Sequence, residues 1–233
     1  MTTSAVQGFA DVQAERKTLV IACNMIHDEV IHAMHAVGRE YPIVWIEEGL
    51  HSSIKKLNGA VQEALDNADA SGYECVLLSF GACGNMIEGL HTHNFDLIMP
   101  NTDDCVSIML YPHRTAKQTG VFYITRGWLH SNKNAWNDWD HNAERYGEKK
   151  ANRILSVMLS SYHSMTVVDT GAYPVSDIWT ESVKRAETLN LKHGIESGST
   201  LWLQQLFTGP WDENFLQFGR NETIHVDIFE GGA

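Results

Sequence analysis

Short apolar runs alternate along this chain with segments whose apolar residues recur at helical spacing. In one such segment Ile54, Leu57 and Val61 fall three or four positions apart, which predicts an apolar helix face. The run Val76–Phe80 is almost entirely apolar, as expected for a strand that is covered on both faces. Alternating strands and helices favour a parallel sheet. We therefore predict an α/β fold, a mostly parallel sheet with helices on both faces.

The same sequence patterns give the bounds of the expected strands and helices. The predicted strands are Leu19–Ala22, Ile43–Ile46, Val76–Phe80, Leu97–Met99, Val121–Thr125, Met165–Asp169 and Thr223–Val226. The predicted helices are Asp28–Val37, His51–Ala70, Cys105–Leu110, Asn142–Ser160, Val175–Leu191 and Ser199–Phe207. Between them, Asn132 to Asp140 is predicted to be a polar loop that carries Trp136 and Trp139 and acts as a lid or an interface.

Size and composition narrow the class of protein. The chain has 233 residues, 43% of them hydrophobic, which is enough for one sizeable core. We expect a flexible lead-in over residues 1–17 and a single domain over 18–233. A formal charge of -12 argues against nucleic acid as a partner, and no apolar run is long enough to span a membrane. With no apolar leader at the start, the expected location is cytoplasmic and the expected partner a small-molecule substrate.

Three of the four cysteines follow predicted strands. Cys23 comes directly after the first strand, Cys83 follows the central strand, and Cys105 follows the next strand and an acidic turn. Ligands of an open α/β sheet bind beyond the carboxyl ends of its strands, so these thiols are expected to converge there. Thiolates favour soft metals, and three protein ligands with one open position are typical of a catalytic zinc site. The sequence therefore predicts a metal site made of these three cysteines.

Two further features concern the loop around Cys83 and the fourth cysteine, Cys75. Gly81 and Gly84 flank Cys83, and glycine allows a backbone to approach closely and to direct N–H groups at a sulfur or an anionic ligand. The alternative is a plain turn from strand to helix. Cys75 stands at the start of an apolar strand, so we interpret it as a small buried hydrophobic residue.

Candidate acid–base groups lie near the predicted metal ligands. His27 follows Cys23 by four positions and is a candidate for a general base or a fourth ligand, or else a solvent-exposed residue at a helix start. Asp104 precedes Cys105 and is either a helix cap or a carboxylate that supports the site. His93, just after the Cys83 loop, is another residue that could line the pocket, and His91 and His113 are similar.

Three residues beyond the later strands are candidates for binding a substrate. Arg126 offers a forked guanidinium for a carboxylate or a phosphate, and Trp128 offers an apolar wall or a surface for a cationic methylated group. Tyr173 follows the Met165–Asp169 strand and is placed to close the pocket. Core packing and a surface ion pair are the structural alternatives.

Several short motifs together resemble the family catalogued as domain of unknown function 1638. They are Ile21-Ala22-Cys23, Gly81-Ala82-Cys83-Gly84, Asp103-Asp104-Cys105, Tyr123 to Trp128, Leu203 to Gly209, Trp211-Asp212 and Phe215. The resemblance extends over roughly residues 19–228. It implies an association with corrinoid-dependent methyl-transfer systems, because members of the family often accompany them.

These observations lead to one main hypothesis and two alternatives. The main hypothesis is a metalloenzyme that holds Zn²⁺ and transfers a methyl or related group to a thiol or a corrinoid-linked acceptor. The first alternative is a lyase or desulfidase with a [4Fe–4S] cluster, in which three thiolates leave one iron open to substrate. The second is a non-catalytic carrier of a metal or cofactor that serves a methyltransferase.

Overall fold

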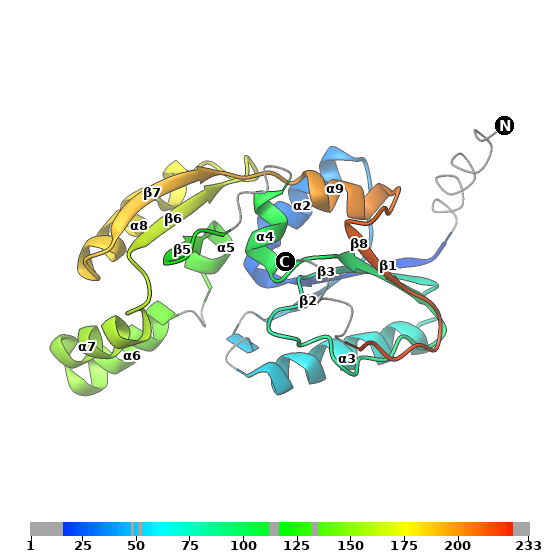
Figure 1. The fold of residues 1–233 in the computed structure, drawn as a ribbon, viewed down its shortest axis with the longest axis horizontal. Coiled ribbons are helices and arrows are strands. Elements are labelled where there is room, and N and C mark those ends of the chain that lie inside the picture. Colours follow the sequence, from blue (N-terminus) through cyan, green and yellow to red (C-terminus); the bar gives the residue numbers. More distant parts are fainter. Residues whose placement is uncertain (1–15, 48, 51–52, 112–116, 132–134, 226–233) are drawn as a thin grey trace.

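The protein is elongated and consists of two lobes, each built around its own sheet (Figure 1). The structure is a computed structural model and describes residues 16–47, 49–50, 53–111, 117–131 and 135–225. We call residues 16–110 with 199–225 the first lobe, and residues 117–198 the second lobe. Apart from residues 16 and 17, both lobes lie within the stretch 18–233 that was expected to form a single domain.

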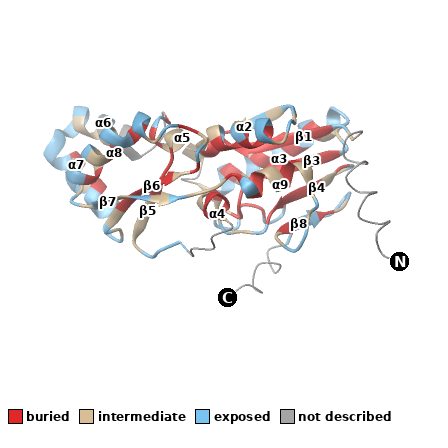
Figure 2. Cartoon of the chain, turned by 90° about the horizontal axis from the view of Figure 1, so that it is seen from above, coloured by how far each residue is buried: buried red, intermediate tan, exposed pale blue. Residues whose placement is uncertain are grey.

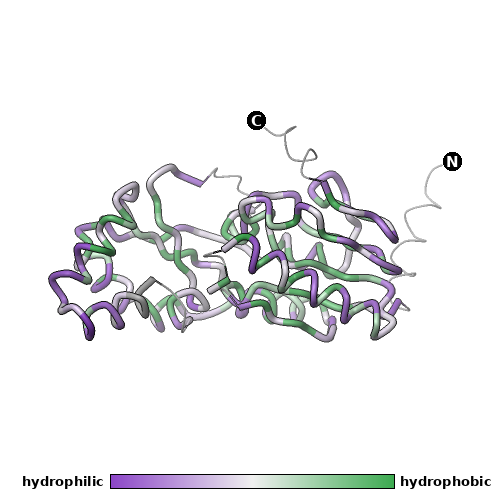
Figure 3. Tube along the Cα trace, turned by 90° about the horizontal axis from the view of Figure 1, so that it is seen from below, coloured by the Kyte–Doolittle hydropathy of each residue, from purple (hydrophilic) through white to green (hydrophobic). Residues whose placement is uncertain are grey.

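The first lobe contains a sheet of five strands in the order β2-β1-β3-β4-β8. Neighbours run parallel, except that β8 is antiparallel to β4. The strands are β1 (Thr18–Cys23), β2 (Ile43–Ile46), β3 (Cys75–Ser79), β4 (Asp96–Pro100) and β8 (Phe215–Phe218). Every residue of β1 and β3 is buried, which explains their continuous apolar sequences (Figures 2 and 3).

Helices cover both faces of this sheet. The helix α3 (Ile54–Ala70) packs against β1 and β2 through the apolar face predicted from its spacing. On the other face lie α2 (His27–Ala36) and α9 (Leu201–Thr208), which contact each other (Figure 1). The short helix α4 (Cys105–Leu110) packs against α9. A one-turn helix, η1 (Asn24–Ile26), joins β1 to α2.

The second lobe has a parallel sheet in the order β5-β6-β7 and a smaller core. Its strands are β5 (Val121–Ile124), β6 (Ser164–Asp169) and β7 (Lys192–Ser197). Its helices are α5 (Arg126–Leu129), α6 (Ala135–Tyr146), α7 (Glu148–Met158) and α8 (Ser176–Thr188). Tyr123 and Val168 of this lobe also belong to the larger core of the first lobe, so the two cores touch.

The α/β fold class predicted from the sequence is confirmed, and the strands lie in two sheets. The predicted bounds of Ile43–Ile46 and Cys105–Leu110 agree with the structure, and Asp104 caps α4 as expected. The predicted helix Asn142–Ser160 was wrong in extent. The structure has two helices there, separated at Gly147, whose φ of 81° interrupts the first helix.

Three other predictions about elements are corrected. Residues 135–140 of the predicted polar loop are the start of α6. The predicted strand at Thr223 is an isolated bridge to His91, whereas the short strand that completes the sheet is β8. The strand β7 was missed because its sequence, Lys192–Ser197, lacks an apolar run. It is an edge strand with much of its surface exposed, so its burial does not require apolar side chains in a continuous run.

The return of the chain from the second lobe to the first passes through a tight contact at Gly198. A Cβ atom added there would lie 2.6 Å from Val168 Cγ1 and 3.0 Å from the carbonyl oxygen of Met109. Gly198→Ala should therefore lower the free energy of unfolding by about 1–3 kcal/mol through overpacking. Chemical denaturation measures this change, with Gly194→Ala on β7 as the control because the nearest atom there is 3.6 Å away. Equal stabilities for the two variants would contradict the prediction.

Candidate functional site: a cluster of three thiols

The first sheet reverses its strand order between β1 and β3. The chain places β2 on one side of β1 and then β3 on the other, so the connections leave the carboxyl ends in opposite directions. Cys23 is the last residue of β1, and Cys83 lies in the loop that follows β3. This is the position at which open α/β sheets bind ligands.

Backbone hydrogen bonds bring the Cys83 loop against the turn that precedes Cys105. The N–H of Ala82 donates to the carbonyl of Thr102 at 2.8 Å, and the N–H of Cys83 donates to that of Asp103 at 2.6 Å. The two segments are so close that a Cβ atom on Gly81 would lie 2.4 Å from the Cα of Asp104. Gly81 is required because no side chain fits between the two backbones.

The result is that the three candidate thiols meet. The Cys105 side chain forms hydrogen bonds with the side chains of both Cys23 and Cys83, and it accepts one from the backbone N–H of Gly81. The bond with Cys23, together with complete burial, raises the pKa of the Cys105 thiol well above its ordinary value, while the bonds from Cys83 and Gly81 oppose that rise. Cys23 is fully buried, whereas Cys83 is half-buried and is the thiol nearest to solvent.

Cys83 also has an unusual backbone. Its φ of 45° lies in the left-handed region, and that of Gly84 beside it is 70°. A non-glycine residue in this region costs roughly 1–3 kcal/mol, and strained residues of this kind cluster at functional sites. Among the described residues, no group of three or more histidine, cysteine, aspartate or glutamate side chains is arranged to hold a metal ion as it stands. The metal site therefore stays a prediction.

The two acid–base candidates have other contacts. His27 has a side chain that is 48% exposed, and its ring lies 4.6 Å from the ring of Trp45 on β2. The Oδ1 atom of Asp104 accepts hydrogen bonds from the backbone and hydroxyl of Ser107 at 3.0 Å, and its other oxygen pairs with Lys117. Capping α4 is thus the role that the geometry gives Asp104.

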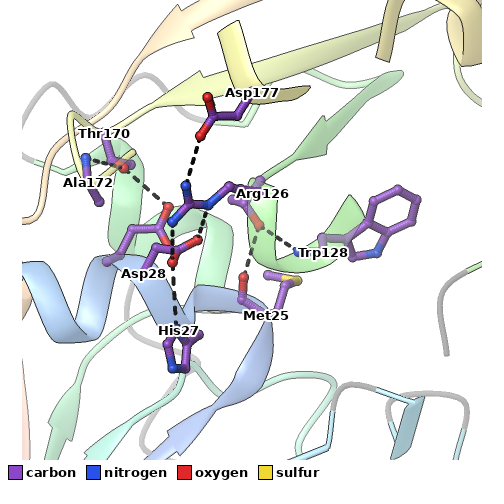
Figure 4. A network of polar contacts seen from close by, with 10 residues as sticks. Met25, His27, Asp28, Arg126, Trp128, Thr170, Ala172 and Asp177 are labelled. Carbon is purple, nitrogen blue, oxygen red and sulfur yellow. Dashed lines mark hydrogen bonds and ion pairs between the residues drawn. The ribbon is translucent and has the colours of Figure 1, made fainter. Parts of the chain in front are cut away.

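Arg126 joins the two lobes through a network of ionic contacts (Figure 4). Its Nε and Nη2 atoms donate to both oxygens of Asp28 on α2, at 2.9 and 2.7 Å, and its Nη1 donates to Asp177 on α8 at 3.0 Å. The hydrogen bond from Arg126 holds the pKa of Asp28 below its usual value. The fork predicted for a substrate carboxylate is here occupied by a carboxylate of the protein.

The other two substrate candidates pack beside this network. Tyr173 is buried, lies 5.1 Å below the Arg126 guanidinium and donates its hydroxyl to the carbonyl of Val168. Burial raises the pKa of Tyr173. Trp128 packs edge-on against Phe122 at 5.0 Å. Both residues therefore pack within the protein, which is the structural role that the sequence had left open for them. Substrate binding by either residue remains a prediction.

A buried carboxyl group at the junction of the lobes was missed. Glu29 is completely buried, its Oε1 accepts a hydrogen bond from Thr170 of the second lobe at 3.2 Å, and its Oε2 has no hydrogen-bond partner within the described part of the chain. Burial raises the pKa of Glu29 to about 7. The sequence pattern could have indicated this burial, because Glu29 shares a helix face with the apolar residues Ile26 and Ala33.

A second contact between the lobes involves Met25, two residues after Cys23 in the sequence. The hydroxyl of Thr125 donates to the carbonyl of Met25 at 2.9 Å and caps α5 by accepting from the N–H of Trp128 (Figure 4). A Cβ atom on Gly127 would lie 2.5 Å from that same carbonyl oxygen. The start of α5 therefore rests against the backbone that leaves the thiol cluster.

Two other regions lie away from the thiols. A groove of about 560 Å³ runs along α8, between Trp139, Asp177, Lys184 and Thr188. His93 pairs with Asp66 at 2.7 Å and stacks edge-on with His91 at 4.7 Å. The remaining histidine candidate, His113, lies outside the described residues.

Together these features define an α/β protein with two lobes and a cluster of three thiols at the carboxyl ends of its first sheet. The chain belongs to the family described as Protein of unknown function (DUF1638), which it matches over residues 45–207. Cys83 and Cys105 lie inside this range, and Cys23 lies before it. No curated protein matches the chain, and neither does any solved structure. No helix within the described residues is long and apolar enough to cross a membrane.

The buried carboxyl predicts a specific pH dependence of stability. The pKa of Glu29 is about 7 in the folded protein against 4.5 for the ordinary side chain, so the folded state binds more protons between these values. Stability should therefore fall by about 3 kcal/mol as pH rises from 4.5 to 7. Glu29→Gln cannot ionise and should lack this component.

Chemical denaturation at several pH values measures the difference between the two proteins. Glu63→Gln, at an exposed position on α3, is the matched control and should keep the wild-type pH dependence. If Glu29→Gln lost stability over this pH range as steeply as the wild type, Glu29 would not be the group responsible.

Proposed function

We propose that Cys23, Cys83 and Cys105 bind one soft metal ion, with Zn²⁺ as the first candidate, and that this centre transfers a methyl or related group. The proposed acceptor is a thiol or a corrinoid-linked group. The observation that carries the proposal is the contact of the Cys105 thiol with both other thiols. Three distant cysteines meet at the edge of the sheet where ligands of this architecture bind.

The chemistry of the three donors fits a soft metal. Sulfurs bound tetrahedrally to one zinc lie about 3.8 Å apart, a separation close to that of hydrogen-bonded thiols. The three side chains would have to rearrange around the ion, because no group of three ligands within the described residues is arranged to hold a metal as it stands. The N–H of Gly81 would support a thiolate at Cys105, as outer hydrogen bonds do in metal sites. A bound cation also favours the deprotonated form of a thiol that burial otherwise keeps protonated.

The position of Cys83 gives a substrate a route to the centre. This residue is half-buried, while the other two thiols are buried, so an incoming group would approach from its side. The left-handed backbone at Cys83 is the kind of local strain that is found at functional sites. We keep Arg126, Trp128 and Tyr173 as the proposed substrate-binding residues, which requires Arg126 to exchange Asp28 for a substrate carboxylate. His27 and Asp104 are the candidates for moving protons.

When it is bound, a zinc ion lowers the pKa of a coordinated thiol and leaves it nucleophilic at neutral pH. In the proposed transfer, the acceptor sulfur would form a bond to the methyl carbon while the bond between that carbon and its donor breaks, and the donor would leave with the electron pair of the broken bond. The proton of the acceptor thiol goes to a nearby base, for which His27 is the proposed group because its ring is exposed to solvent.

The cytoplasmic location belongs to the same proposal. None of the four cysteines, all of which lie in the described part of the chain, forms a disulfide, and a site made of thiols suits a reducing compartment. The proposed partners are a small-molecule substrate and a corrinoid protein.

Metal analysis of the protein purified without oxygen tests the proposal. We expect about one zinc per chain and a colourless protein. A brown protein with absorbance from thiolate bound to iron would favour the [4Fe–4S] alternative. A metal that exchanges freely without any transfer activity would favour the carrier. Protein that contains no metal and takes up neither Zn²⁺ nor iron would contradict the proposal.

A pair of variants tests the ligands. Cys83→Ala should remove the metal and leave the fold intact, because Cys83 lies in a loop outside the sheet. Cys75→Ala is the matched control, since Cys75 is buried at the start of β3. This control should keep its metal and lose on the order of 1 kcal/mol of stability. Elemental analysis with thermal unfolding gives both readouts, and unchanged metal content in Cys83→Ala would count against its role.

A further inference from the structure

The three thiols differ in their access to solvent. Cys23 and Cys105 are fully covered by the core, whereas Cys83 is half-buried. Oxidation of cysteine begins at thiols that a solute can reach. An oxidant in solution would therefore meet Cys83 before it met either of the other two sulfurs.

The partner for an oxidised Cys83 is already in place. Its side chain forms a hydrogen bond with that of Cys105. The two backbones are tied by the bonds from Ala82 to Thr102 and from Cys83 to Asp103, and Gly81 lets them touch. A disulfide requires Cα atoms about 4.4–6.8 Å apart, so it forms only between cysteines whose backbones are held close. The backbone of residues 81–83 is in direct contact with that of residues 102–104, which immediately precede Cys105, and this contact together with the hydrogen bond between the two thiols favours a disulfide between them.

We propose that Cys83 and Cys105 form an oxidation site, in which a peroxide converts the two thiols to a disulfide and so removes two of the three ligands of the proposed metal centre. The loss of metal rests on the proposed function, whereas formation of the disulfide does not. The site would make metal retention depend on the redox state of the surroundings.

The reaction has two steps. The Cys83 sulfur attacks one oxygen of the peroxide, so that a sulfur–oxygen bond forms and the oxygen–oxygen bond breaks, which leaves a sulfenic acid and one water. The Cys105 sulfur then attacks the Cys83 sulfur, the disulfide forms, the sulfur–oxygen bond breaks, and the second water leaves with the Cys105 proton. Two thiols are oxidised and one hydrogen peroxide is reduced to two waters.

The test treats the metal-stripped full-length chain with one equivalent of hydrogen peroxide under native conditions. We expect the intact mass to fall by about 2 Da, and peptide mapping to place the disulfide between Cys83 and Cys105. Cys75→Ala should behave as the wild type. Cys105→Ala should stop at a sulfenic acid on Cys83, which dimedone traps. Cys23→Ala should still form the disulfide.

The outcomes separate this inference from the proposed function. Protein that binds Zn²⁺ but forms no Cys83–Cys105 disulfide when stripped and oxidised would overturn the inference and leave the metal site standing. Protein that forms the disulfide but binds no metal would support the oxidation site and overturn the proposed function. A disulfide to Cys23, or oxidation of Cys83 beyond the sulfenic acid in the wild type, would also overturn the inference. Release of Zn²⁺ in step with the disulfide would support both.

Discussion

The thiol cluster depends on a backbone contact between two loops that have no regular structure. The loop after β3 and the turn after β4 are held together by two N–H to carbonyl hydrogen bonds, and this pairing carries Cys83 to Cys105. Because β1 and β3 are adjacent parallel strands, the end of β1 brings Cys23 to the same place. These two hydrogen bonds satisfy backbone groups of both loops, and they fix the position of Cys83 relative to the start of α4.

The junction between the lobes contains ionic contacts, whereas the interior of each lobe is apolar. Arg126 pairs with Asp28 while Glu29, the next residue, is buried with one oxygen unpartnered among the described residues. Partial burial of an Arg–carboxylate pair costs solvation, and breaking it costs more, so such pairs fix a geometry better than they add stability. The start of α5 adds a neutral contact through Thr125, which ties the second lobe to the chain leaving Cys23.

The sequence predicted the features that burial dictates. The strands β1 and β3, the helix α3 and the N-cap Asp104 follow from apolar runs, helical spacing and capping chemistry. It also led to the expectation that Cys23, Cys83 and Cys105 would converge. The structure places the Cys105 side chain against the other two, and their role as metal ligands stays a prediction. Thiol positions follow from topology, since the carboxyl ends of parallel strands meet at one edge.

What the sequence could not predict depends on contacts between distant segments. The edge strand β7 has little apolar pattern, so only its pairing with β6 makes it a strand. The pairing of Arg126 with Asp28 requires α5 of the second lobe to lie against α2 of the first, and nothing local to either residue indicates it. Glu29 is an ionisable residue in a helix that begins with acidic residues, and its contact with Thr170, 141 positions away, cannot be read from the local sequence.

Gly81 has a consequence for how this protein can vary. It carries no functional group, yet any side chain there would collide with the backbone of Asp104 and push the Cys83 loop away. A mutational scan would then find position 81 intolerant of substitution because of this backbone contact, and the damage would extend to the meeting of the Cys83 and Cys105 sulfurs. Gly81, Cys83 and Cys105 are therefore expected to vary together in evolution, because the contact between the two cysteines depends on a glycine at position 81.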